Sequence, residues 1–299
     1  MLDRSTCRLI GTAAAFVLSA ASFACVDIVS AARYVEREDK KFAVSGKPDV
    51  SLSTFDGSIE IRPSGRGEVA VTIEKHAMTK EAAAQIEVHT EQNANHIVVD
   101  VRIPKRNGFL DFNNNLSAKL IVSLPAESDV RAHSGDGSID IERIAGTFEL
   151  RSGDGSIRAR DLTGDVKVHT GDGAIRIDSA NGAVDADTGD GSVTLSGKFT
   201  ELRVRTGDGS VNVRAESGSA ASADWNVTTG DGSIVLELPD NFNGELDAHT
   251  GDGAIQVQDV TVSNVTGRIT KHDLRGRLGT GGAAVRLRTG DGTITLRRS

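Results

Sequence analysis

The chain has 299 residues, long enough for one large domain or two ordinary ones. It contains 33 glycines but only 5 prolines, so its glycine content does not indicate a disordered linker. The formal net charge of −8, with acidic and basic residues interspersed, argues against a nucleic-acid-binding surface. Composition therefore favours a folded protein whose partner is not a nucleic acid.

Residues 1–31 are predicted to be a secretory signal peptide. Arg4 and Arg8 precede an apolar run over residues 9–21, and small residues follow, so that cleavage would fall after Ala24 or after Ala31. The run is too short to span a bilayer comfortably, and no later segment could span one. We therefore expect an exported protein, in the periplasm, on the cell surface or secreted, with no transmembrane segment in the mature chain.

The only cysteines are Cys7 and Cys25. Cys25 directly follows the first cleavage position, so a lipid anchor there is an alternative, although Ser22 and Phe23 match the usual lipobox poorly. A chain cut after Ala31 has no cysteine. Its stability must then come from burial and backbone pairing, because it has no disulfide.

Residues 42–128 show strand patterns without a fixed period. Alternating apolar residues predict strands at 50–61, 68–74, 86–88, 96–103 and 118–124, with one short helical stretch at 80–85. Repeat proteins need end segments that protect their open edges from pairing with other chains. We interpret this region as an N-terminal β cap that merges into the repeats that follow.

Residues 129–299 contain a Gly-Asp-Gly repeat. Its first glycine falls at 135, 153, 171, 189, 207, 230, 251 and 290, so the first four intervals are 18 residues and the later ones are longer. A variant, Phe55-Asp56-Gly57-Ser58-Ile59, lies far upstream. Between the regular turns stand second turns at Ala145-Gly146, Thr163-Gly164 and Asn181-Gly182. Each unit therefore reads strand, turn, strand, turn.

Aligned units give apolar columns with a period of two, which is typical of strands with one buried face. The columns include Ile139, Ile157, Ile175, Val193, Val211, Ile234, Ile255 and Ile294 after the turn, and Val130, Phe148, Val166, Val184, Leu202, Trp225, Leu246 and Val285 before it. Two all-β folds satisfy this pattern: an antiparallel meander of hairpins, or a parallel β-solenoid with one 18-residue unit per coil.

One outward column favours the single-stranded parallel β-solenoid. It reads Arg131, Glu149, Lys167, Asp185, Arg203, Asn226, Asp247 and Arg286, and its charge alternates over the first five units. Equivalent side chains of successive coils would lie about 4.8 Å apart, where opposite charges stabilise and like charges repel. A meander gives no such reason for alternation. On the last strand, Arg297 and Arg298 are expected to guard an exposed edge against pairing.

The repeated aspartates allow two interpretations. They are Asp136, Asp154, Asp172, Asp190, Asp208, Asp231, Asp252 and Asp291. The structural interpretation is that each carboxylate accepts backbone N–H bonds in its own turn. The alternative is calcium in a secreted β-roll, for which Asp136, Asp154, Asp172, Asp190 and Asp208 are the candidates. Calcium binds six to eight oxygen ligands, and one carboxylate per coil provides few of them. We expect no metal or other cofactor.

Two further columns flank the turns. The residue before each turn is a hydroxyl residue of inward parity, which predicts a buried ladder: Ser134, Ser152, Thr170, Thr188, Thr206, Thr229, Thr250 and Thr289. His133, His169 and His249 share an outward column, in which Arg151 would stand between the first two. A metal site would need three or four converging ligands, so we expect these to be surface histidines.

No catalytic residue is predicted, and we expect a non-enzyme. The sequence has no Gly-x-Ser-x-Gly, no His-Glu-x-x-His and no catalytic cysteine. Paired carboxylates on one flank of a β-helix could make a polysaccharide-active enzyme, which is the alternative. A site is normally an exception to a repeat, however, and here the aspartates are the rule.

These motifs resemble the bacterial "putative adhesin" family of exported β-solenoid proteins. The resemblance rests on Thr-Gly-Asp-Gly-Ser followed by Ile or Val, as at 206–211 and 229–234, on Val-Ser-Leu-Pro at 122–125, and on the closing stretch 278–296. It covers most of the chain beyond residue 40 and implies a binding or scaffold role in the cell envelope or outside the cell, with an envelope component, glycan or protein as partner. Specificity would lie at the interruptions 215–223 and 261–282, unless these are merely tolerated surface loops.

Overall fold

A computed structural model describes residues 34–103, 116–266 and 270–299. The predicted signal peptide, with Cys7 and Cys25, lies outside the described residues. In the described part, all 23 strands belong to one hydrogen-bonded sheet, and the one helix is α1 (Lys80–Ala83). The prediction of an all-β fold is confirmed.

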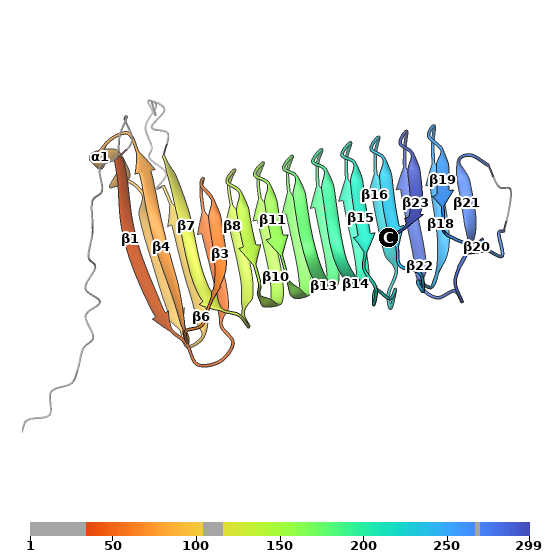
Figure 1. Ribbon diagram of the computed structural model, residues 1–299. Coiled ribbons are helices and arrows are strands. Elements are labelled where there is room, and N and C mark those ends of the chain that lie inside the picture. Colours follow the sequence, from red (N-terminus) through yellow and green to blue (C-terminus); the bar gives the residue numbers. More distant parts are fainter. Residues whose placement is uncertain (1–33, 104–115, 267–269) are drawn as a thin grey trace, which may run out of the picture.

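Several strands begin or end at the repeated turns. In chain order they are β1 (Tyr34–Ala43), β2 (Asp49–Thr54), β3 (Ile59–Ser64), β4 (Glu68–Ala77), β5 (Glu87–Asn93), β6 (His96–Arg102), β7 (Ser117–Pro125), β8 (Asp129–Ser134), β9 (Ile139–Glu142), β10 (Ala145–Ser152), β11 (Ile157–Arg160), β12 (Thr163–Thr170), β13 (Ile175–Thr188), β14 (Val193–Thr206), β15 (Val211–Ala215), β16 (Trp225–Thr229), β17 (Ile234–Leu238), β18 (Gly244–Thr250), β19 (Ile255–Gln258), β20 (Val262–Ser263), β21 (Asp273–Leu278), β22 (Ala284–Thr289) and β23 (Ile294–Arg298). They stand side by side in a long row, with β1 near one end and β21 near the other (Figure 1).

Pairing in the middle of the row is parallel, with a regular offset. Phe148 pairs with Val130 before it and with Val166 after it, an offset of 18 residues each time. Ile157 pairs in the same way with Ile139 and Ile175. Equivalent positions of successive units are therefore direct neighbours. In this stretch the hairpin meander is excluded.

Each repeat unit contributes to two sides of the row. One side, the first face, consists of β8, β10, β12, β16, β22 and β18 with the second halves of β13 and β14. The other, the second face, consists of β9, β11, β15, β17, β23 and β19 with the first halves of β13 and β14.

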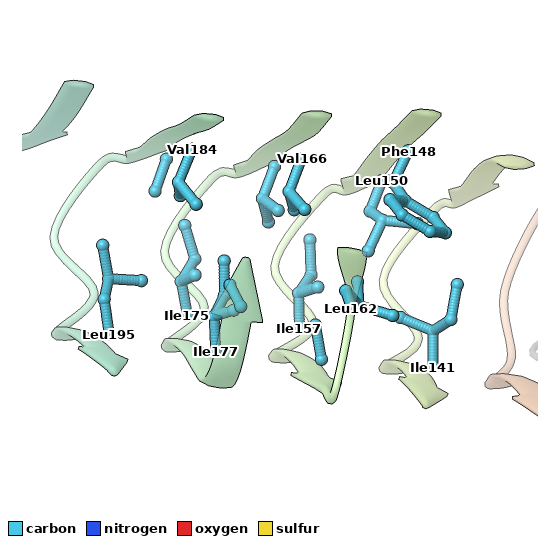
Figure 2. Packing of buried hydrophobic residues seen from close by; sticks show 14 of the residues in the cluster. Ile141, Phe148, Leu150, Ile157, Leu162, Val166, Ile175, Ile177, Val184 and Leu195 are labelled. Carbon is cyan, nitrogen blue, oxygen red and sulfur yellow. The ribbon is translucent and has the colours of Figure 1, made fainter. Parts of the chain in front are cut away.

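The core lies between the two faces. Ile157, Ile175 and Leu195 point from the second face toward Val166 and Val184 of the first (Figure 2), and each of these side chains is at most 2% exposed. Burying one such side chain stabilises the fold by about 1.5–3 kcal/mol. The period-two columns of the sequence are thus the two walls of one continuous core.

The regular parallel pattern does not extend over the whole chain. Later offsets are longer, as between Leu202 and Trp225. At the N-terminal end β1, β4 and β7 pair antiparallel, as do β5 and β6, and at the other end β21 pairs antiparallel with β18 and β20. The sheet is therefore mixed, and the uniform 18-residue pairing offset holds only in its middle.

Units at both ends are stacked out of chain order. β2 and β3 lie between β6–β7 and β8–β9, so the upstream variant Phe55–Ile59 turn belongs to a unit inside the stack. β22 and β23 lie between β16–β17 and β18–β19. The prediction that Arg297 and Arg298 guard an exposed edge is wrong, because their strand is paired on both sides.

Candidate functional site

The turns of the repeat are closed by the hydroxyl residues that precede them. Thr229 shows the pattern: its Oγ1 donates to the carbonyl oxygen of Gly209 in the preceding unit at 2.8 Å and accepts the N–H of Gly232 in its own turn at 3.2 Å. The predicted ladder is confirmed in that all eight hydroxyl residues are buried: Ser134, Ser152, Thr170, Thr188, Thr206, Thr229, Thr250 and Thr289. Each one donates to a carbonyl of the unit next to it. The ladder is therefore structural.

Close approach of successive turns explains the repeated glycines. A Cβ atom added at Gly209 would lie 2.0 Å from the carbonyl oxygen of Gly191, a distance that no side chain tolerates. The same approach recurs from turn to turn, as between Gly191 and Gly173. Only glycine allows the backbones to stack this tightly.

The repeated aspartates are exposed along this edge. Within the described residues, no hydrogen bond reaches the carboxylates of Asp136, Asp154, Asp172, Asp190, Asp208, Asp231, Asp252 or Asp291. The side-chain hydrogen bonds found in the turns run through the neighbouring hydroxyls instead. The structural role predicted for the aspartates thus has no hydrogen bond to support it. No group of three metal-ligating side chains is found in the described ranges, so the calcium alternative also gains no support.

The histidine column is placed as the sequence suggests. Arg151 pairs in register with both His133 and His169 and stands between them, and all three side chains are exposed. His249 lies far along the row and contacts Asp273 of β21 at 2.8 Å. These histidines do not converge on one point.

Charges on the first face follow the spatial order of the strands. The predicted column runs from Arg131 to Arg203 as in the sequence, but then continues Asn226, Arg286, Asp247 and Arg275. Arg288 and Arg275 approach Asp247 from either side at 2.5 and 3.1 Å. Burial alone would raise the pKa of Asp247, but these hydrogen bonds hold it below its usual value.

The second face carries a similar triad. The Glu237 side chain is 9% exposed and lies between Arg214, at 2.6 Å, and Arg297, whose Nε donates to it at 2.9 Å. Burial alone would raise the pKa of Glu237, but the two guanidinium groups lower it. The carboxylate therefore stays ionised and cross-links three units of the stack.

A notch lies beside this triad, where the outward side chains are short. Thr194 and Ser196 of β14 stand between Arg176 of β13 and Arg214 of β15, and Asn212 lies next to Thr194 in register. The hollow has a volume of about 240 Å³, and the backbones of β14 and β15 contribute to its lining.

The notch residues have hydrogen-bonding capacity to spare. Within the described part of the chain, neither the Thr194 hydroxyl nor the Asn212 amide has a protein partner, whereas Ser196 Oγ accepts the N–H of Ser179 at 3.3 Å. Arg176 is held by Asp178 at 2.8 Å. The site is thus a small polar pocket with preset cationic walls. The sequence signal for this pocket is weak: it consists of a short outward residue, Ser196, within a column of longer side chains.

The first predicted specificity loop, residues 215–223, is held against the stack. Ser219 Oγ accepts the N–H of Phe199 at 3.2 Å and donates to the carbonyl of Gly197 at 3.3 Å. The other, 261–282, contains residues outside the described ranges; its described part holds β20 and β21. No described residue of either loop lines the notch.

Comparison with known proteins gives one extensive match and several distant ones. Residues 49–297 match the family described as Toastrack DUF4097, whereas no curated protein matches. A "putative adhesin" structure from Parabacteroides distasonis is 14% identical at a TM-score of 0.45, and one from Bacteroides fragilis is 13% identical at 0.43; the alignments cover 87% of this chain and 96% of each structure. A "putative lipid binding protein" from Parabacteroides distasonis shows 12% identity, a TM-score of 0.44 and the same coverage. At these TM-scores the likenesses are too distant to assign a function.

The described residues also include no helix with the length and apolar character needed to cross a membrane.

Proposed function

This chain belongs to the Toastrack DUF4097 family, and from that premise we propose that it is a non-enzymatic, adhesin-like binding or scaffold protein. In this proposal the stacked units form a parallel β-solenoid with coils of about 18 residues, capped by the antiparallel strands at its N-terminal end. The protein is exported to the cell envelope or secreted. Its long side faces are the surfaces that a partner contacts.

The observation that supports a binding role is the notch. Thr194 and Asn212 are rigidly placed on neighbouring strands about 4.8 Å apart. Their polar groups have no protein partner among the described residues and stand between two arginines that intramolecular ion pairs hold in place. Preset polar groups on a rigid scaffold lose little conformational entropy when they bind. Such groups suit a ligand rich in hydroxyls.

We propose an extended glycan as the ligand class. A linear polymer can lie along the second face and place one sugar unit in the notch, where an amide, two hydroxyls and two guanidinium groups surround it. Arginine binds carboxylate or sulfate substituents of such a polymer well, because its planar fork donates two parallel hydrogen bonds.

An array of glycans and envelope components tests the proposal. We expect binding to at least one extended glycan, and about tenfold weaker binding for the double variant Thr194→Ala with Asn212→Ala, because two hydrogen bonds are lost. Gln256→Ala, an exposed change on the same face in β19, is the matched control and should bind normally. Unchanged affinity of the double variant contradicts the notch as the site. Release of reducing ends from a bound glycan would favour the polysaccharide-active enzyme instead.

A further inference from the structure

The unit formed by β22 and β23, here called the C-terminal coil, fills a slot in the stack. One wall of the slot is β16 with β17, and the other is β18 with β19. Val285 pairs with Trp225 on one wall and with Leu246 on the other, and Ile294 pairs with Ile234 and Ile255. Both faces of the stack are therefore continued through a segment that chain order would place at the end.

The C-terminal coil provides apolar contacts and hydrogen bonds to both walls. Its four inward side chains, Val285, Leu287, Ile294 and Leu296, are fully buried. The hydroxyl ladder also passes through it: Thr289 donates to Gly232 at 2.7 Å, and Thr250 of the next unit donates to Gly292 at 2.8 Å. Backbone pairing and apolar burial thus supply the affinity of the slot for this coil.

Charge makes the slot selective. The coil contributes four arginines, and each one meets an acidic residue in a wall, directly before β16, or in the segment between the walls. The pairs are Arg286 with Asp224, Arg288 with Asp247, Arg297 with Glu237 and Arg298 with Asp240. If the two walls met directly, the register would bring Asp224 beside Glu245. Exposed pairs contribute little free energy individually, but like charges on neighbouring strands are unfavourable.

The coil is joined to the preceding strand by the short loop 279–283. This loop crosses from β21 to β22 past the end of β18, where Asn243 Oδ1 accepts the N–H of Thr280 at 2.8 Å. Three of its five residues are glycines with positive φ: Gly279, Gly281 and Gly282. The two walls are connected to each other through residues 239–243, so the chain links them independently of the loop 279–283.

We infer that the slot is also an intermolecular binding site, and that two copies of this chain exchange their C-terminal coils. The basic coil of one copy complements the acidic walls of the other as it does its own. An exchange conserves every pairing described above, and only the loop 279–283 has to change its path. Exchange of an identical element is a low-cost route to a dimer.

Disulfide trapping tests this inference on the full chain. Asn226 of β16 and Arg286 of β22 are register partners whose side chains point outward. With Cys7 and Cys25 replaced by serine, one tagged chain carries Asn226→Cys and a second carries Arg286→Cys. A disulfide between them forms only when the coil of one chain occupies the slot of the other. We expect a covalent heterodimer, whose yield rises with protein concentration and after brief warming toward the unfolding midpoint.

Two controls make the outcome decisive. One chain carrying both substitutions should form an intramolecular disulfide and stay monomeric, which verifies the geometry. Pairing the Asn226→Cys chain with one carrying Gln256→Cys should give no heterodimer, because Gln256 lies on the other face. The inference is overturned if the Arg286→Cys pair gives no more heterodimer than the Gln256→Cys pair. Failure of the intramolecular disulfide would overturn the slot itself.

Discussion

Replacing Thr229 by valine separates the role of the hydroxyl ladder from that of the aspartates. Valine has nearly the same shape as threonine and suits a strand, so packing and backbone preference change little. The change removes the hydroxyl that donates to Gly209 at 2.8 Å and accepts from Gly232 at 3.2 Å. Thr229 is 3% exposed, so a carbonyl and an N–H lose this partner at a buried position.

The expected loss is about 2–6 kcal/mol in the free energy of unfolding, because each of the two buried polar groups left without a partner costs about 1–3 kcal/mol. Urea unfolding measures it. The only tryptophan, Trp225, lies fully buried in the same unit, 6.1 Å from the ring of Phe199 and 4.8 Å from that of Phe242. Its fluorescence therefore reports the unfolding of this part of the stack, and circular dichroism should report the unfolding of the whole sheet.

Asp231→Asn is the matched control in the same turn. Its carboxylate is exposed and receives no hydrogen bond within the described residues, so we expect a change of less than about 0.5 kcal/mol. Thr229→Ser keeps the hydroxyl, and its loss in the free energy of unfolding should lie between those of Thr229→Val and Asp231→Asn. Equal losses for Thr229→Val and Asp231→Asn would refute the assignment of the turn to the hydroxyl.

Three further predictions concern the close approach of the turns, the calcium alternative and the Glu237 triad. Gly209→Ala should lower the free energy of unfolding in urea by about 3 kcal/mol, because its Cβ would meet the Gly191 carbonyl. Gly65→Ala, which has open space around it, should lower it by less than about 1 kcal/mol. Similar losses for the two variants would contradict the close approach. Excess chelator should leave the Tm unchanged in a thermal scan, and a fall of several degrees would revive the calcium alternative. The pKa of Glu237 is lower in the folded state than its ordinary value of 4.5, so its stabilisation is complete above that pH and is lost as pH falls through the lower folded pKa. Glu237→Gln should therefore flatten the dependence of stability on pH below 4.5, and an unchanged slope in acid titrations would argue against the triad.

The candidate site shows where prediction from sequence reaches its limit. The hydroxyl ladder followed from parity alone, because a residue two positions from a buried one lies on the same side of a strand. The turn role of the aspartates stays a prediction: their position beside glycines suggests a turn acceptor, while at Thr229 the hydroxyl accepts the N–H of the turn. The notch forms because long side chains flank Thr194 and Asn212. The pairing register of β13, β14 and β15 decides which side chains these are.

The sequence by itself determined the strands of the repeats, their buried sides and the stacking of like residues on like. It did not predict β1, and the segment predicted as one strand at 50–61 is the pair β2 and β3 with a turn between them. Period-two patterning and an 18-residue repeat leave few other ways to bury the apolar columns. Only the tertiary structure decided the order of the units at both ends. Because each unit presents nearly the same edge, the apolar columns and hydroxyls fit several neighbours equally well. Long-range pairing, assisted by contacts such as that between Arg286 and Asp224, selects the one arrangement in which the last unit lies inside the stack.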